Sequence, residues 1–176
     1  MRTFRALLLI FVASAVVAAS SFGQTEKPPF TLTIKANKPT EVAGSQVFVW
    51  VNMTNISDRP VDCTEVEEDG TLVSYDYDVR DENAKPVDLR DKSLPYSGRG
   101  HTGKTWDKCS LGPGESRNIE LIVSFRYDFS KPGKYVVQIS RRASLDSKGF
   151  RTGEWVKSNA ITITVVAPTP PGDAPQ

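Results

Sequence analysis

Apolar and polar residues alternate along most of the chain after residue 29. In residues 30–36, the apolar residues Phe30, Leu32 and Ile34 alternate with Thr and Lys. In residues 46–54 the four odd positions are all apolar, whereas only Phe48 and Trp50 are apolar at even positions. A period of two turns one face of a strand toward a core. Both segments are therefore predicted to be half-buried strands, and the odd face of 46–54 is predicted to point inward.

The same alternation recurs in five further segments, at residues 73–79, 86–89, 119–125, 135–139 and 161–165. Turn-forming residues (Gly, Pro, Asn and Asp) separate most of them. No segment keeps a helical period over several turns. The pattern predicts an all-β domain over residues 30–167, built as an antiparallel β-sandwich of about seven short strands.

Several motifs indicate the immunoglobulin-like version of this sandwich. Residues 132–135 (PGKY) put Tyr135 at the start of a strand after a tight turn. Immunoglobulin-like folds carry a tyrosine there whose hydroxyl bonds to nearby backbone. Together with residues 51–61, 75–81 and 111–116, this motif resembles BsuPI-type proteinase-inhibitor domains, in the same order and across residues 44–140. The resemblance implies an immunoglobulin-like fold and inhibition of a proteinase.

The two ends of the chain differ in composition from this domain. Residues 6–19 are an apolar stretch after Arg2 and Arg5, and small residues follow, which predicts a signal peptide over residues 1–23. The stretch is shorter than the roughly 20 residues of a spanning helix, although an uncleaved anchor is the alternative. Residues 24–29 are predicted to be a linker, and the proline-rich residues 168–176 a disordered tail. We therefore expect a secreted or periplasmic protein.

Charge and residue counts narrow the function classes further. The chain carries 22 Lys and Arg against 21 Asp and Glu, a balance that does not favour a broad nucleic-acid-binding surface. A single His excludes zinc sites that need two or more His. We expect no cofactor, no metal site, no nucleic-acid partner, and no membrane span after signal cleavage.

The chain has two cysteines, Cys63 and Cys109. In an oxidising compartment they are predicted to form a disulfide. On the chain-entropy model, closing a loop of this size stabilises the fold by about 4 kcal/mol. Two free buried thiols, or a catalytic thiol beside His101, are the alternatives.

Three motifs match functional patterns without the required context. Residues 98–105 fit the P-loop pattern G-x-x-x-x-G-K-[ST], but a P-loop needs a buried strand before it and a helix after it, and neither is predicted. The acidic residues within 62–69 lack the spacing of a calcium loop, so we interpret them as a solvated turn. Asn52 and Asn55 begin N-glycosylation sequons, which matter only in a eukaryotic source.

Two long segments combine aromatic and basic residues. Residues 90–116 and 141–157 are predicted to be loops, longer than usual sandwich connections, that emerge at the same end as residues 55–60. Trp, Tyr and Arg are enriched at binding hot spots, and a rigid scaffold commonly holds binding residues on loops. The candidate contact residues are Tyr96, Arg99, Trp106, Phe150, Arg151 and Trp155.

These observations favour a module that binds a protein or cell-surface partner through its loops. No nucleophile-elbow motif is present, and we expect no enzymatic activity. Inhibition of an extracellular proteinase is the alternative function. For Trp106 and Trp155 there is also a structural alternative, in which the rings fold back over Phe48 and Trp50 as part of the core.

Overall fold

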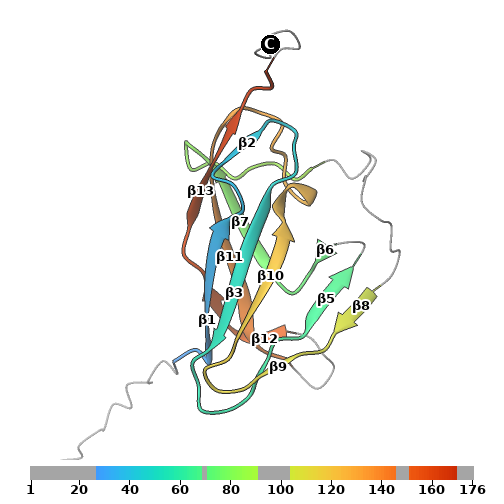
Figure 1. Ribbon diagram of the computed structural model, residues 1–176, viewed down its shortest axis with the longest axis vertical. Coiled ribbons are helices and arrows are strands. Elements are labelled where there is room, and N and C mark those ends of the chain that lie inside the picture. Colours follow the sequence, from blue (N-terminus) through green and yellow to red (C-terminus); the bar gives the residue numbers. More distant parts are fainter. Residues whose placement is uncertain (1–26, 69–70, 91–103, 146–150, 170–176) are drawn as a thin grey trace, which may run out of the picture.

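The computed structural model describes residues 27–68, 71–90, 104–145 and 151–169 (Figure 1). The predicted signal peptide, half of the linker and most of the tail lie outside these residues. Within the described ranges, regular structure is almost entirely strand, and no helix is long and apolar enough to cross a membrane.

Two sheets form the layers of a sandwich (Figure 1). The first contains β1 (Phe30–Ala36), β3 (Phe48–Asn55) and β10 (Ser116–Ile122). The strand β3 lies in the middle and pairs antiparallel with both neighbours. Its odd residues, from Val49 to Met53, are buried, and its even residues are partly exposed. The predicted orientation of this strand is confirmed.

The second sheet is organised around β11 (Gly133–Leu145). The strand β7 (Asp76–Asp81) pairs with one edge of β11, and β12 (Arg151–Lys157) and β13 (Ile161–Val166) follow one another along the other edge. The short β2 (Thr40–Val42) then adds to β13 in parallel. The N-terminal segment contributes β1 to the first sheet and β2 to the second. In the second sheet, β7 and β13 lie on opposite edges of β11. This strand order is that of an immunoglobulin-like sandwich. The predicted fold is confirmed, with one parallel pairing in an otherwise antiparallel structure.

The inward residues of both sheets form one apolar core. Its fully buried side chains include Phe30, Val49, Val51, Leu121, Val137, Ile139 and Ile163. The tyrosine predicted at the corner is also confirmed, since the Tyr135 hydroxyl donates to the Lys131 carbonyl over 2.7 Å. Its ring packs against Phe129, with 4.8 Å between ring centroids.

Four segments differ from the sequence prediction. The predicted loop at 90–116 is one of them, because it contains the strands β8 (Lys104–Asp107) and β9 (Ser110–Leu111). Residues 86–89 lie beside β7 through a single bridge between Arg80 and Pro86 and form no strand. The segment 119–125 leaves the strand after Ile122 and ends in a 3₁₀ turn, η1 (Val123–Phe125). The predicted loop at 141–157 is wrong, because β11 continues to Leu145 and β12 begins at Arg151.

A third, smaller sheet lies beside the sandwich and is called the side sheet below (Figure 1). It consists of β6 (Thr71–Leu72), β5 (Glu65–Glu68) and β8 (Lys104–Asp107), in that order. The connection from β3 to β7 supplies β5 and β6, and the connection from β7 to β10 supplies β8. The short β4 (Val61–Asp62) and β9 (Ser110–Leu111) pair between the same connections.

The side sheet corrects two readings of the sequence. The acidic segment interpreted as a solvated turn contains the strand β5, and Glu65 within it is buried. Lys104 and Thr105, which end the P-loop match, lie in the strand β8. A P-loop requires a helix at that point, so the match lacks its structural context.

Candidate binding surfaces

A disulfide joins the two connections that supply the side sheet. Cys63 follows β4 and Cys109 precedes β9, and their Cα atoms are 4.8 Å apart. The Cys63 amide also donates to the Cys109 carbonyl over 3.1 Å. The predicted disulfide is confirmed, and the alternatives with free thiols are wrong.

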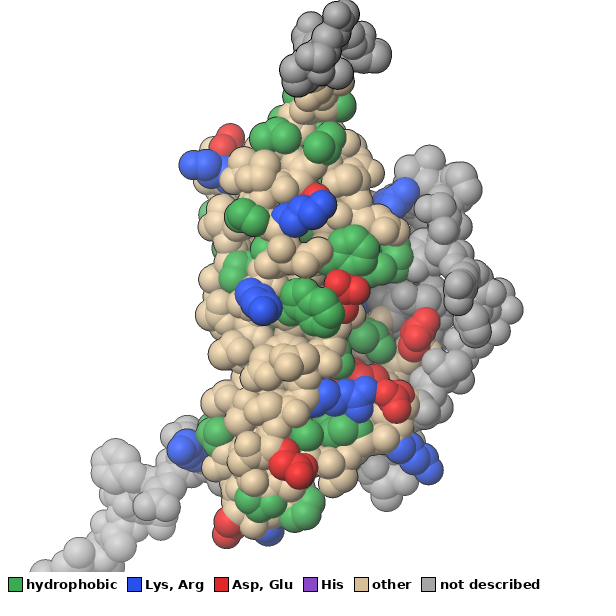
Figure 2. Space-filling view, viewed as in Figure 1, with side chains coloured by type: hydrophobic (Ala, Val, Ile, Leu, Met, Phe, Trp, Pro, Cys, Tyr) green, Lys and Arg blue, Asp and Glu red, His purple; other side chains and the backbone are tan. Residues whose placement is uncertain are grey.

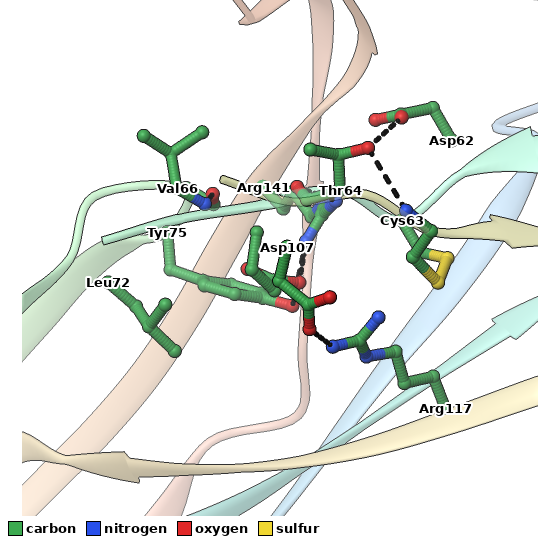
Figure 3. Close-up of polar contacts among 12 residues, drawn as sticks. Asp62, Cys63, Thr64, Val66, Leu72, Tyr75, Asp107, Arg117 and Arg141 are labelled. Carbon is green, nitrogen blue, oxygen red and sulfur yellow. Dashed lines mark hydrogen bonds and ion pairs between the residues drawn. A yellow bond between two sulfur atoms is a disulfide. The ribbon is translucent and has the colours of Figure 1, made fainter. Parts of the chain in front are cut away.

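A buried ion pair links the side sheet to the sandwich (Figure 3). Arg141 on β11 is 0% exposed, and Glu65 on β5 is 4% exposed. One guanidinium nitrogen, Nη1, donates to Glu65 Oε1 and, over 2.8 Å, to the Tyr75 hydroxyl. The other, Nη2, donates to the Thr64 carbonyl over 3.1 Å. Arg141 therefore contacts the side sheet through a carboxylate and a backbone carbonyl.

Tyr75 completes this cluster. Its hydroxyl donates to Glu65 Oε1 over 2.9 Å, and its ring lies 5.1 Å from the Arg141 guanidinium carbon. Burial raises the pKa of Tyr75 well above its ordinary value, so the phenol stays protonated as a donor. Two buried atoms of the ion pair, Glu65 Oε2 and Arg141 Nε, have no hydrogen-bond partner in the described structure.

A pocket of about 150 Å³ opens between the side sheet and β10. Its lining residues are Glu65, Glu67, Leu72, Asp107, Arg117 and Ile119. Arg117 Nη2 donates to Asp107 Oδ2 in an ion pair (Figure 3). Figure 2 shows acidic side chains gathering on this side of the molecule. Carboxylates therefore outnumber cations around the pocket.

The outer face of β11 and β12 carries a second surface. Trp155 on β12 is 45% exposed, and the guanidinium carbon of its cross-strand partner Arg142 lies 4.4 Å from its ring centroid. Arg142 Nη1 also donates to the Gly153 carbonyl over 3.0 Å. The ring is thus held by a cation–π contact and still presents part of its surface to solvent.

A β-bulge shapes the strand next to Trp155. The pairing of β11 with β12 shifts by one residue between Arg142 and Ser144. The extra residue of the bulge is on β12, where Gly153 has a φ of +79°. Glycine adopts this conformation without strain. A Cβ at this position would also come within 3.3 Å of the Ser144 hydroxyl. Glycine is therefore the residue that fits here.

The six candidate contact residues fall in different parts of the chain. Trp155 is described in full, and the core alternative for it is wrong because its ring is exposed. Trp106 pairs with Val66 in the side sheet, and Arg151 pairs with Leu145 at the start of β12, but their side chains lie outside the described part. Tyr96, Arg99 and Phe150 lie outside the described residues altogether. Trp106 and Trp155 thus belong to different sheets, whereas Arg151 and Trp155 share a strand.

Of the two sequons, Asn55 has a clear structural role. It is 1% exposed, and its amide nitrogen donates to the carbonyls of Arg59 and Leu111. Its side-chain oxygen accepts from the amide and the hydroxyl of Ser57. Glycosylation would replace one of the two N–H groups of this buried nitrogen and so remove at least one of these hydrogen bonds. Asn52 instead lies on the outer face of β3, where it donates to Asn118 over 2.9 Å.

Sequence reasoning missed the pocket and the ion pair behind it. Glu65 was interpreted as part of a solvated turn, and Arg141 as part of a binding loop. One signal was present: Arg141 continues the inward series of Tyr135, Val137 and Ile139, which places it on the core face of a longer strand.

No family model matches the chain, and no curated protein sequence matches it. Among solved structures, it is similar to the CARDB domain of PF1109 from Pyrococcus furiosus in solution, with 14% identity and a TM-score of 0.40 over 78% of this chain and 94% of that one. A crystal structure of the same domain in complex with di-metal ions gives 15% identity and a TM-score of 0.41, covering 80% and 90%. The C-terminal domain of wzt gives 9% identity and a TM-score of 0.45, covering 81% and 77%. At these identities and TM-scores, the comparisons assign no residue role and no function to this chain.

Proposed function

We propose that the protein is an exported, non-catalytic immunoglobulin-like module that binds a protein or cell-surface partner, and that Trp155 lies at the centre of the contact. The observation that carries the proposal is the exposed ring of Trp155 on a paired strand, with Arg142 against it. Tryptophan and arginine are the residue types most enriched at binding hot spots.

The setting of Trp155 supports this role. An indole has only two side-chain torsions, so it contributes a large contact area at a small entropic cost. Its strand is fixed by pairing with β11, and the Arg142 stack restricts the ring further. A partner would therefore meet an ordered aromatic surface.

The test compares two tryptophans of opposite sheets. Envelope and extracellular proteins captured by the purified protein supply the partner, and its affinity is then measured for Trp155→Ala and for the control Trp50→Ala, which changes the outer face of β3. We expect Trp155→Ala to weaken binding by about 2 kcal/mol or more and Trp50→Ala to leave it nearly unchanged. A melting temperature close to that of the parent must accompany the weaker binding of Trp155→Ala. Equal affinities for Trp155→Ala and the parent would contradict the proposal.

Inhibition of an extracellular proteinase is the second candidate. Its support is the resemblance of residues 44–140 to BsuPI-type domains, with which the immunoglobulin-like strand order agrees. A panel of serine, cysteine, aspartic and metalloproteinases, each assayed with the protein in excess, tests it. Saturable inhibition of one class favours this function, and full activity of every class excludes it for that panel.

A further inference from the structure

We infer that the free edge of β10 binds an extended, basic segment of a protein partner, which adds to the first sheet as a fourth strand. The strand β10 pairs with β3 and with no other strand of the described residues. Figure 1 shows it at the side of the front sheet nearest the side sheet. Trp155 lies in the other sheet of the sandwich, so this is a second contact surface, beyond the proposed function.

The backbone of β10 offers hydrogen-bonding groups along this edge. The Asn55 amide donates to the Glu115 carbonyl over 2.9 Å. At the other end of the pairing, the Val123 amide donates to the Val47 carbonyl, also over 2.9 Å. Bonded and non-bonded residues alternate along an antiparallel ladder, so the odd residues of β10 bond to β3 and the even ones point their N–H and C=O groups away from it. The exposed residues with such groups are Ser116, Asn118 and Glu120.

The strand order shows what this edge lacks. In the constant-type immunoglobulin sandwich, the sheet with the equivalents of β1, β3 and β10 has a fourth strand on the far side of β10. The connection from β7 to β10 would supply that strand. Here the described part of this connection forms β8 and β9, which pair with β5 and β4 instead. An extended segment of a partner fits the position of the fourth strand, as in donor-strand complementation.

The pocket beside this edge suits side chains of an added strand. Successive side chains of a strand point to opposite faces of the sheet. Because Ile119 of β10 lines the pocket, every second side chain of a neighbouring strand would also point toward it. Leu72 and Ile119 form the apolar part of its lining, which suits an aliphatic side chain. In strand addition, main-chain bonds give affinity and such pockets give specificity.

The unpaired charge along the edge is negative. Arg117 forms an ion pair with Asp107. Within the described part of the chain, no ion pair includes Glu67, on the pocket side of the sheet, or Glu120, on its outer face. Residues directly opposite on neighbouring strands attract when their charges differ and repel when they are alike. The edge therefore complements a segment that carries Lys or Arg.

The probe that tests the inference is a capped heptapeptide, Thr-Lys-Val-Thr-Val-Lys-Thr, with valines on one face and lysines on the other. Hydrogen exchange followed by NMR reports the pairing. We expect the amides of Ser116, Asn118 and Glu120 to exchange about tenfold more slowly or less with the peptide bound, whereas those of Ile119 and Leu121, already bonded to β3, change little. Uniform slowing along β10, slowing only elsewhere, or no effect at millimolar peptide would overturn the inference.

Two further peptides separate the main-chain contribution from the charge. The same peptide with every amide N-methylated cannot donate to β10 and must not bind. The analogue with Glu in place of Lys should bind about fivefold more weakly. Equal affinities for the Lys and Glu peptides would contradict a basic partner. Slow exchange of the three edge amides without peptide, together with a dimer in sedimentation velocity, would overturn the inference in favour of a second copy of this chain.

Substitutions at Asn118 test the edge from the side of the protein. Asn118→Pro removes an N–H that β3 does not use, and proline is tolerated at such edge positions. Asn118→Ala keeps the N–H, and both variants lose the same side-chain hydrogen bond with Asn52. We expect Asn118→Pro to bind the Lys peptide about tenfold more weakly and Asn118→Ala to bind it like the parent. Equal binding by the two variants would overturn the inference.

A charge reversal leaves the backbone of β10 intact and so does not depend on how proline is accommodated. Glu120→Lys should weaken binding of the Lys peptide about fivefold. Its matched control, Glu154→Lys at an exposed position of β12, should change it by less than about twofold. Equal affinities for these two variants would contradict charge recognition at the edge. Trp155→Ala should bind the peptide like the parent, so the two proposals fail separately.

Discussion

The sandwich and the side sheet are held together by different kinds of interaction. Between the two main sheets most buried residues are apolar, as in β1, where Phe30, Leu32 and Ile34 alternate with outward polar residues. The side sheet is joined to this body by the Arg141–Glu65 and Arg117–Asp107 ion pairs and by the Tyr75 hydroxyl, and the Cys63–Cys109 disulfide joins the two connections that supply it. The sandwich thus depends on burial of apolar area, which is non-directional. The side sheet adds directional contacts to the apolar packing of Leu72 and Val66.

This difference has a functional consequence. Each directional contact has one geometry in which it is fully made, so the contacts fix the side sheet and the pocket it forms with β10 in position. They also make the side sheet vulnerable to single changes, because a buried charge that loses its partner is strongly destabilising. An apolar core spreads the same loss over many contacts. The following variants measure how far the two regions differ.

Arg141→Met should have the largest effect. It leaves the Glu65 carboxylate buried without its cation, and breaking a buried pair in this way costs about 3–5 kcal/mol. The loss is measured as the change in free energy of unfolding by chemical denaturation. Arg142→Met, one residue away on the outer face, removes an exposed cation–π contact and an exposed hydrogen bond to the Gly153 carbonyl, and should cost about 0.5–1 kcal/mol. If the two variants lose the same stability, Arg141 does not act through its buried partners.

The double variant Glu65→Leu with Arg141→Met sharpens this result. Replacing both members of a buried pair by apolar side chains is often neutral or stabilising. We therefore expect the double variant to be more stable than Arg141→Met alone. A double variant less stable than Arg141→Met would mean that Glu65 is stabilised by groups other than Arg141.

Sequence periodicity was sufficient for the sandwich and insufficient for the side sheet. In β1, in β13 and in β3 as far as Met53 the inward positions are apolar, so the strand and its buried face follow from the local pattern. In β11 the inward series reaches Arg141, and in β12 the aromatic Trp155 points outward, so the same rule predicted a loop. Burial of Arg141 depends on Glu65 and Tyr75, which are 76 and 66 residues away in the sequence. Periodicity within one segment contains no information about such partners.

The disulfide is expected to have the second largest effect. Removing it with Cys63→Ala and Cys109→Ala together frees the two connections that carry the side sheet. Loss of a native disulfide from a small exported domain typically costs about 2–5 kcal/mol. Thermal melting of the double alanine variant against the parent gives the value. An unchanged melting temperature would show that the side sheet is held without the covalent link.

Tyr75→Phe and Tyr135→Phe make the same chemical change in the two regions. The Tyr75 hydroxyl bonds to two charged side chains, Glu65 and Arg141, and hydrogen bonds to charged groups contribute about 1.5–3 kcal/mol. The Tyr135 hydroxyl bonds to one backbone carbonyl, that of Lys131, and should contribute about 1 kcal/mol. The free energies of unfolding of both variants, measured against the parent, show which substitution costs more stability. A larger loss for Tyr135→Phe would contradict the difference drawn between the regions.

The smallest effect is a pH dependence within the sandwich. Hydrogen bonds from the Ser130 side chain and amide lower the pKa of Asp128 below its ordinary value. A carboxyl group with a lowered folded-state pKa adds stability above its unfolded pKa, and that stability is lost as pH falls through the folded-state value. Asp128→Asn should therefore be less stable than the parent at pH 6, and the gap should close at strongly acidic pH. A gap that stays constant between these pH values would exclude the carboxylate as its cause.

The side sheet is a separately held unit attached to a largely apolar sandwich. Native-state hydrogen exchange tests this directly, because amides of locally opening units exchange at lower free energies than core amides. We expect the amides of β5 and β8 to exchange at a lower opening free energy than those of β3. In Arg141→Met, β5 and β8 should lose protection while β3 keeps part of its own. Equal opening free energies for the side sheet and β3, in the parent and in the variant, would contradict the claim.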